Sequence, residues 1–146
     1  MKRTTKQFFK EYHEARWNFT GSYNERREQE LKMFRDWYDE MEVGDHCHIA
    51  HWSDVSPCTI IKRTKTTITV RYDKATRKES WKPEFVIGGF SAHCLNNDDQ
   101  SNAWNIEEDE NGRIEVFRWS KKFNCYKNAA DEKLFPEWAK KYDYNF

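Results

Sequence analysis

The stretch from Val43 to Tyr72 constrains the fold more than any other part of the chain. It opens with a glycine turn at Gly44, continues through a partly alternating segment, and contains two β-branched runs, 58–63 and 66–72. Such residues favour strands, and short strands joined by polar turns are typical of small barrels. Barrels of this kind mostly bind partners and seldom catalyse covalent reactions. The stretch therefore directs the functional question toward a partner.

The composition indicates a folded domain with an aromatic core. Leu, Ile, Val and Phe together number only 25 of 146 residues, a level that signals disorder in a chain of high net charge. Here the formal net charge is zero and 16% of the residues are aromatic. Aromatic side chains bury large areas and tolerate polar neighbours. We expect a helical extension over residues 1–42 and a mainly β domain over residues 43–146.

Two amphipathic helices are expected before the strands. Residues 5–18 carry aromatic side chains along one stripe, and residues 22–42 begin with a capping-box pattern from Ser22 to Glu25. Gly44 follows at a position where a left-handed turn commonly ends a helix. The two helices would form a hairpin that packs on the barrel or pairs with a second copy of the chain in a homodimer.

The rest of the chain is expected to complete a small antiparallel β-barrel or sheet of the SH3-like type, which makes the fold class α+β. The expected segments are strand 46–51, a charged loop over 73–82, strand 83–87, an irregular stretch over 90–103 and strand 123–126. In strand 46–51 the alternation places Cys47, Ile49 and His51 on one face, opposite His46, His48 and Ala50.

The last third of the chain predicts a hairpin, a helix and a docked tail. Asn111-Gly112 favours a two-residue type I′ turn, which would pair Ile106 with Phe117 and Trp104 with Trp119. Residues 131–141 are expected to form a short C-terminal helix that contains Pro136. The terminal segment 142–146 is too aromatic for a solvated end, so we expect it to pack on the domain.

The chain shows no pattern of export or membrane insertion. The first ten residues are basic, but no apolar run follows them as it does in a secretory signal. No apolar stretch approaches the roughly 18 residues that span a bilayer. The four cysteines lie far apart, which is typical of free thiols in a reducing compartment. We expect a cytoplasmic protein.

The histidines and cysteines do not form a recognisable metal or catalytic set. The residues that offer ligand atoms are His46, Cys47, His48, His51, Cys58, His93 and Cys94. They lack the paired spacings that zinc sites use. A Cys94 nucleophile with His93 or His51 as its base is conceivable, but adjacent side chains seldom face each other and no orienting group is evident. We expect no metal, no cofactor and no enzymatic activity, with buried thiols and hydrogen-bonded histidines instead.

Basic residues offer a first binding hypothesis. Residues 43–90 hold eight Lys or Arg against five acids, whereas residues 91–115 hold one against seven. The basic set consists of Lys62, Arg63, Lys65, Arg71, Lys74, Arg77 and Lys78, with Trp52, Tyr72 and Trp81 nearby in sequence. Cations neutralise phosphates and aromatic faces stack on bases, so this face predicts nucleic-acid binding. The alternative is a solvated strand edge that lysines protect from aggregation.

A second hypothesis is a pocket for a nucleotide-like ring near the double glycine. The residues are Trp81, Phe85, Phe90, His93, Asn96, Asn97 and Gln100. Aromatic rings stack on such ligands and amides read their edges. The alternative is that the phenylalanines belong to the core and the asparagines form turns.

Several short motifs resemble a family of small uncharacterised proteins of bacteriophages and prophages. They are Val43-Gly44-Asp45, Trp52-Ser53-Asp54, Ile61-Lys62-Arg63-Thr64, Arg71 to Thr76, Lys82-Pro83-Glu84-Phe85, Gly88 to Cys94 and Tyr142 to Phe146. The resemblance covers residues 43–146 and departs at Ile87, where a proline is expected. It implies a viral origin and no established activity. The first strands also resemble Tudor- and KOW-type SH3-like barrels.

Together these patterns favour a phage-encoded accessory protein that binds without catalysing a reaction. It would antagonise a host system, most plausibly a defence system, by sequestering a host protein or a nucleotide signal in the host cytoplasm. The acidic segment 98–110 would mimic nucleic-acid charge, or the segment 81–100 would hold the ligand. The alternative is an SH3-like nucleic-acid-binding module that uses the basic 62–78 face.

Overall fold

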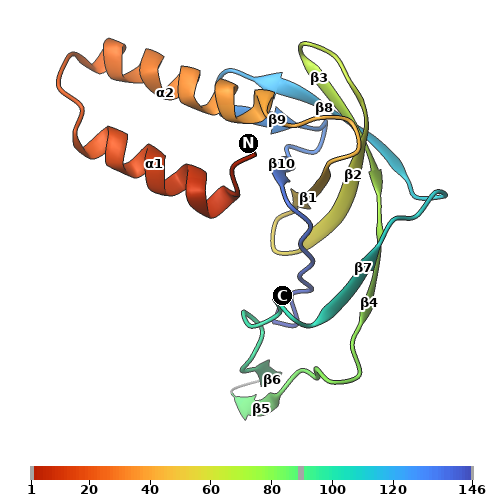
Figure 1. Ribbon diagram of the computed structural model, residues 1–146. Coiled ribbons are helices and arrows are strands. Elements are labelled where there is room, and N and C mark those ends of the chain that lie inside the picture. Colours follow the sequence, from red (N-terminus) through yellow and green to blue (C-terminus); the bar gives the residue numbers. More distant parts are fainter. Residues whose placement is uncertain (1, 89–90, 146) are drawn as a thin grey trace.

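The computed structural model describes residues 2–88 and 91–145 and contains a helical hairpin beside a closed β-barrel (Figure 1). The helices are α1 (Thr5–Trp17) and α2 (Tyr23–Asp39). Six antiparallel strands close the barrel in the order β1-β10-β9-β8-β3-β2. The predicted α+β class, with helices followed by a small barrel, is confirmed, and the barrel fits the SH3-like type.

Each helix begins at the hydroxyl residue that caps it. The Thr4 side chain accepts a hydrogen bond from the Gln7 amide while the Gln7 side chain accepts one from the Thr4 amide, so a full capping box is present. At α2 the Ser22 side chain accepts from the Glu25 amide. The predicted second helix is too long at its end, because α2 stops at Asp39. The left-handed turn at Gly44, with φ +95°, instead leads the chain into the barrel.

The barrel strands follow the predicted alternation closely. They are β1 (His46–Ala50), β2 (Val55–Arg63), β3 (Thr67–Tyr72), β8 (Ile114–Ser120), β9 (Cys125–Lys127) and β10 (Lys133–Pro136). Cys47 and Ile49 of β1 are buried, as are Ile68 and Val70 of β3. The period of two therefore predicts correctly which side of these strands faces the barrel interior.

The predicted helix over residues 131–141 is wrong, because β10 occupies this segment. Leu134 is fully buried and lies opposite Ile49 of β1, so the strand closes the barrel. Asp131 and Glu137 on either side take positive φ values of 60° and 80°, which a helix excludes. Pro136 fits the end of a strand, where it has no ladder hydrogen bond to donate.

The predicted hairpin across Asn111-Gly112 is also wrong. β8 pairs with β3, which brings Phe117 opposite Ile68 in the core, and β7 (Trp104–Glu107) pairs with β4 (Lys74–Arg77) outside the barrel. Neither Asn111 nor Gly112 takes a positive φ. Gly112 is required for a different reason: a Cβ there would lie 1.9 Å from the Tyr72 carbonyl oxygen.

Two further strand pairs extend away from the barrel. The predicted charged loop 73–82 contains β4, and the predicted irregular stretch 90–103 contains β6 (Ser91–Cys94), which pairs with β5 (Phe85–Gly88). Figure 1 shows that β4 continues the line of β3 downward, with the β5–β6 hairpin at its far end. We call residues 78–103, which lie beyond β4, the distal lobe.

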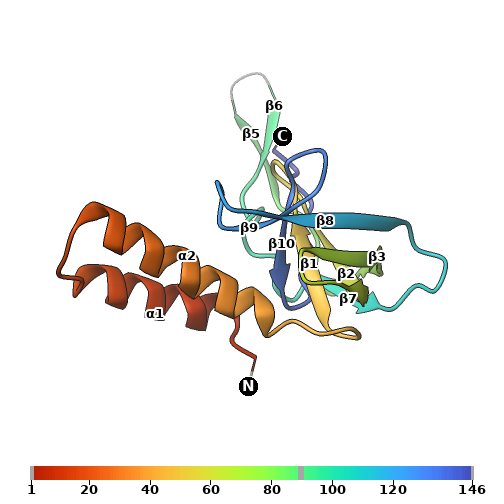
Figure 2. The same cartoon turned by 90° about the horizontal axis from the view of Figure 1, so that it is seen from above.

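The helices and the barrel share one hydrophobic core. Phe8 of α1 stacks on Trp37 of α2 with ring centroids 4.0 Å apart, and the Tyr38 hydroxyl donates to the Leu134 carbonyl at 2.7 Å. Figure 2, seen from above, shows the hairpin extending sideways from the barrel, with α2 reaching it at its C-terminal end. Among the described residues, no helix combines the length and apolar character needed to cross a membrane.

Candidate functional site

The structure brings most of the predicted pocket residues to the C-terminal tail, residues 142–145. The Trp81 and Phe85 rings each lie 6.0 Å from the ring of Tyr144. Asn96 and Gln100 lie in the same distal lobe, and His93 is exposed on β6. Phe90 lies outside the described residues. The predicted docking of the tail is therefore confirmed for residues 142–145. Most of the described pocket residues pack against this tail and do not surround an open pocket.

The amides of the lobe are occupied by the backbone of the tail. Gln100 donates to the Tyr142 carbonyl at 2.8 Å and accepts from the Tyr142 amide at 3.0 Å. Asn97 accepts from the Tyr144 amide at 2.9 Å and donates to the Asp143 carboxylate at 3.0 Å. Both amides are buried. An amide that already reads a peptide backbone in this way has no free edge with which to read a nucleotide.

The base of the β5–β6 hairpin is tied to the tail and to the lobe itself. The Cys94 amide donates to the Asn145 side chain at 2.8 Å, and that side chain donates back to the Cys94 carbonyl at 3.1 Å. The Asn96 side chain accepts from the Glu84 amide and donates to the Lys82 carbonyl. These hydrogen bonds position the hairpin although its apolar side chains contribute little to a core.

Large apolar side chains remain exposed at this end of the molecule. We call this set the apolar end: Trp52, Phe85, Val86, Ile87, Leu95 and Tyr142. Ile87 is 96% exposed and Trp52 is 93% exposed. The Trp52 loop joins the set through the tail, because the Asp143 amide donates to the Asp54 carboxylate at 2.7 Å. Exposed apolar side chains on a projecting hairpin, with others on the tail and the Trp52 loop, are typical of a surface that meets a partner.

One member of the predicted nucleic-acid face has a structural role. The Arg63 guanidinium donates to the Tyr38 and Met41 carbonyls, each at 2.6 Å, at the C-terminal end of α2. A cation there satisfies carbonyls that have no helical partner. Arg63 thus joins the barrel to the helix, and its charge is not presented to a phosphate.

The other basic residues do not form one patch. Lys62 lies near the end of β2, Lys65 lies in the β2–β3 turn, and Arg71 lies on β3. Arg77 and Lys78 lie at the far end of β4. A mostly extended run such as 65–78 spans up to roughly 40 Å at about 3.3 Å per residue. Arg77 donates to the Tyr144 hydroxyl at 3.1 Å. The cations therefore follow a long ribbon, with Lys74 beside Glu107 across the β4–β7 pair.

The acidic segment 98–110 is likewise divided. Asp98 pairs with Lys141 of the barrel end at 2.7 Å, while Glu108 lies 3.6 Å from His46, whose ring stacks on Trp138. Glu107 lies on β7 next to the basic strand. Asp98 and Glu107 thus lie beside lysines of the same chain, and Glu108 lies beside a histidine, so these three carboxylates do not form a continuous acidic surface.

The cysteines are all buried and free. Burial strongly raises the pKa of the Cys47 and Cys58 thiols, so both are protonated at neutral pH. The Cys94 thiol donates to the Asn96 side chain at 3.3 Å. Across residues 2–88 and 91–145, no cluster of three or more His, Cys, Asp or Glu side chains is arranged to hold a metal ion.

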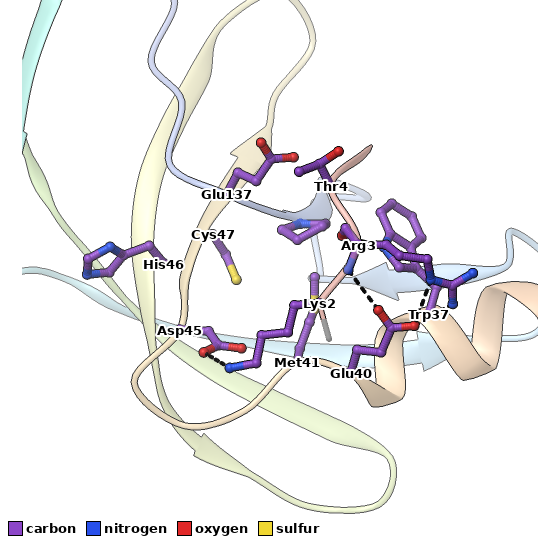
Figure 3. Close-up of a pocket in the computed structure, with 11 residues that line it drawn as sticks. Lys2, Arg3, Thr4, Trp37, Glu40, Met41, Asp45, His46, Cys47 and Glu137 are labelled. Carbon is purple, nitrogen blue, oxygen red and sulfur yellow. Dashed lines mark hydrogen bonds and ion pairs between the residues drawn. The ribbon is translucent and has the colours of Figure 1, made fainter. Parts of the chain in front are cut away.

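The helix–barrel junction contains a cavity of about 240 Å³ that the sequence pattern does not reveal. Its apolar walls include Trp37, Met41 and Cys47. Figure 3 shows ion pairs at its opening, where Lys2 reaches Asp45 and Arg3 reaches Glu40. Drug-sized ligands occupy cavities of about 300–1,000 Å³, so the volume of this cavity lies just below that range. Because its charged groups are already paired, it offers little recognition chemistry.

A chain of hydrogen-bonded polar side chains in the barrel is also not evident from the sequence. Ser56, His51 and Glu132 are joined in series by two hydrogen bonds at one end of the barrel. The sequence marks His51 as a candidate metal ligand and as a candidate base for Cys94, but nothing in it marks Ser56 or Glu132 as its partners. Glu132 lies 81 residues from His51, and only the pairing of β1 with both β2 and β10 brings the three together.

Comparison with protein-family models, with curated proteins and with solved structures finds no match. The functional argument therefore depends on the geometry of this chain.

Proposed function

We propose that this chain acts by capturing a protein partner through the apolar end. In line with the resemblance of residues 43–146 to phage proteins, we propose a phage-encoded accessory protein that antagonises a host defence system in the host cytoplasm. The observation that carries the proposal is the projecting β5–β6 hairpin, where Ile87 is 96% exposed and Phe85, Val86 and Leu95 are exposed as well.

Exposed apolar side chains have a cost for a free protein, and this supports a binding role. Each leaves area in contact with water that burial would stabilise by about 25 cal/mol per Å². An isolated two-stranded hairpin is marginal, yet the tail and Asn96 hold this one in place through hydrogen bonds. A hairpin that is anchored at its base and apolar along its strands is suited to insertion into an apolar groove of another protein.

A protein partner is favoured over a nucleotide signal by the use of the lobe's polar groups. Nucleotide sites need free donors and acceptors around a stacking ring. Here Gln100 and Asn97 bind the tail backbone, and the Trp81 indole donates to the Asp99 carbonyl at 2.8 Å. What remains at the surface is apolar area, which a folded protein can cover.

The test uses two exposed isoleucines. Ile87→Asp places a charge on the hairpin, whereas Ile114→Asp places the same charge on β8, where Ile114 is 59% exposed. The purified variants and the wild type are immobilised and incubated with lysate of the bacterial host, and bound proteins are quantified by mass spectrometry. We expect a partner that is retained by the wild type and by Ile114→Asp, and is lost with Ile87→Asp.

Two measurements identify other outcomes. Thermal shift and Trp fluorescence with a nucleotide panel would reveal a nucleotide signal, and a response abolished by Ile87→Asp would replace the protein partner. Light scattering on the purified chain would show whether the apolar end, or the helical hairpin with its exposed Trp17, pairs with a second copy. Equal retention of all host proteins by both isoleucine variants would refute the proposal.

A further inference from the structure

Ser56, His51 and Glu132 form a hydrogen-bonded relay at the mouth of the barrel. Ser56 alternates with the buried Cys58 on β2, and His51 continues the inward face of β1, so both side chains face the end of the barrel interior. The Ser56 hydroxyl oxygen lies 2.8 Å from His51 Nε2, and His51 Nδ1 contacts Glu132 Oε2. All three side chains are partly exposed.

The carboxylate determines how the protons lie in this relay. A carboxylate only accepts, so His51 must carry a proton on Nδ1 to donate to Glu132. In the neutral imidazole, Nε2 is then the acceptor, and the hydrogen bond with Ser56 must be donated by the hydroxyl. This is the arrangement in which a histidine removes the proton of a serine nucleophile.

Glu132 is itself held in place. The Asn128 side chain donates to its other oxygen, Oε1, at 2.8 Å and accepts from the Glu132 amide at 2.9 Å. Burial opposes ionisation of Glu132, but the hydrogen bonds from His51 and Asn128 outweigh it and lower the pKa of the carboxyl. The relay therefore ends in a fixed anion, which orients the imidazole and stabilises its protonated form.

Tyr72 and Arg113 accompany the relay. The Tyr72 ring lies beside the His51 ring, with centroids 6.4 Å apart and planes 25° from parallel. Its hydroxyl is buried and has no hydrogen-bond partner with good geometry among the described residues. The Arg113 guanidinium lies 4.5 Å above the same ring. A phenol and a guanidinium can both donate to an oxygen that becomes negative during a reaction.

We propose that Ser56 is an activated nucleophile that accepts the acyl group of a small ester or thioester. The Ser56 oxygen bonds to the carbonyl carbon while its proton passes to His51 Nε2. The bond to the leaving alcohol or thiol then breaks, and that group takes the proton from His51. Water, deprotonated by the same nitrogen, releases the acyl group as a carboxylic acid and restores Ser56.

The surroundings favour a short apolar acyl group. Trp52, 93% exposed, directly follows His51 in the loop between β1 and β2, and the Tyr72 ring lies beside the imidazole. The carboxylates of Glu115 and Glu132, both bonded to Asn128, disfavour an anionic substrate. This inference goes beyond the proposed function and departs from the expectation that the chain has no enzymatic activity. It rests on different atoms, so either can fail alone.

The test is covalent labelling of the full-length chain with an alkyl fluorophosphonate, read by peptide mass spectrometry. We expect one adduct on Ser56 in the folded wild type, and none there after unfolding in urea. Ser56→Ala should abolish the adduct, whereas Ser80→Ala, which alters an exposed serine, should leave the labelling rate unchanged. His51→Gln should slow labelling by about 100-fold or more, the usual contribution of a general base.

Substrate turnover completes the test with 4-nitrophenyl acetate and 4-nitrophenyl butyrate as probes. A burst of one nitrophenolate per chain supports the proposal if Ser56→Ala abolishes it. Continued turnover that depends on Ser56 supports it as well. Absence of an adduct on Ser56 in the folded wild type overturns it, and this result does not depend on whether any variant folds. Equal labelling of Ser56 in folded and unfolded protein overturns it as well, because the relay would then add nothing.

Discussion

The helix–barrel half and the distal lobe of this protein are held together in different ways. The first buries large rings, such as Phe8 stacked on Trp37 at 4.0 Å, in one continuous core. The second is held by side-chain amides such as Gln100, which bind the tail, and it leaves apolar residues such as Ile87 outside. Burial of apolar side chains therefore stabilises the helix–barrel half. The distal lobe is held by hydrogen bonds, so its apolar side chains stay exposed and can contact a partner.

The largest expected effect is in the shared core. Trp37→Ala should lower the free energy of unfolding by about 3–5 kcal/mol, the usual cost of removing a buried aromatic residue. Trp37 is fully buried and its indole donates to the Arg3 carbonyl at 3.0 Å. Trp17→Ala is the matched control, because Trp17 is 89% exposed on α1 and should change stability by less than about 0.5 kcal/mol.

Urea denaturation followed by circular dichroism measures both variants. If Trp37→Ala unfolds only the helices and leaves the barrel transition unchanged, the core is not continuous and the comparison between the two halves must be redrawn. A Trp17→Ala loss as large as that of Trp37→Ala would contradict the exposed position of Trp17.

The second effect concerns the arginine that joins the barrel to α2. Arg63→Ala should cost about 2 kcal/mol, because two partly buried carbonyls at the end of the helix lose a charged donor. Lys62→Ala, at the exposed neighbouring position, should be nearly neutral. Oligonucleotide binding at low salt sharpens the result. Loss of such binding with Lys62→Ala, at unchanged stability, would favour the nucleic-acid-binding alternative.

The third effect is local. Gln100→Ala removes the side-chain donor and acceptor that bind the backbone of Tyr142. The substitution should increase the hydrogen exchange of amides in the distal lobe, with little change in the barrel. The expected cost is about 1–2 kcal/mol of local opening free energy. Asn102→Ala is the control, because Asn102 is exposed in the same turn. Protection that falls equally in β3 and β8 would show that the lobe and barrel open together.

Sequence patterns predicted the helix–barrel half far better than the lobe. The helical stripes and the alternation in β1 and β3 follow from local periods that burial against one core enforces. The errors arose where long-range pairing overrides local preference. Asn111-Gly112 indicates a turn, but the close approach of Gly112 to Tyr72 decides the geometry. Residues 133–136 form a strand because β1 needs a partner to close the barrel.

The candidate sites show the same limit. The aromatic and amide residues near Gln100 predicted a ligand-binding pocket. The sequence does not show that the amides bind the backbone of the C-terminal tail instead. The relay of Ser56, His51 and Glu132 has no sequence motif, because its members are brought together only when two non-consecutive strands pair. Such sites depend on which strands pair with each other, and strand pairing was the feature of the fold that the sequence predicted least well.

The smallest effect expected is the pH dependence that Glu132 contributes. Its pKa is lower in the folded chain than the ordinary 4.5, so its ionised form stabilises the fold at neutral pH. This contribution is present above about pH 4.5 and is lost as the pH falls through the lower, folded value, because the unfolded chain binds the proton first. Glu132→Gln keeps the shape and one acceptor for His51 but removes the charge. The variant should therefore lose less stability than the wild type below pH 4.5.

Urea titrations at a series of pH values between 3 and 7 measure the difference between the two proteins. Glu110→Gln is the control, because Glu110 is exposed in the loop before β8 and receives no hydrogen bond from the described residues. Its acid dependence should follow that of the wild type. If Glu132→Gln follows it as well, the carboxylate is not held by His51 and Asn128 in solution. The relay at the barrel mouth would then lack its fixed anion, and the reactivity inferred for Ser56 would lose its physical basis.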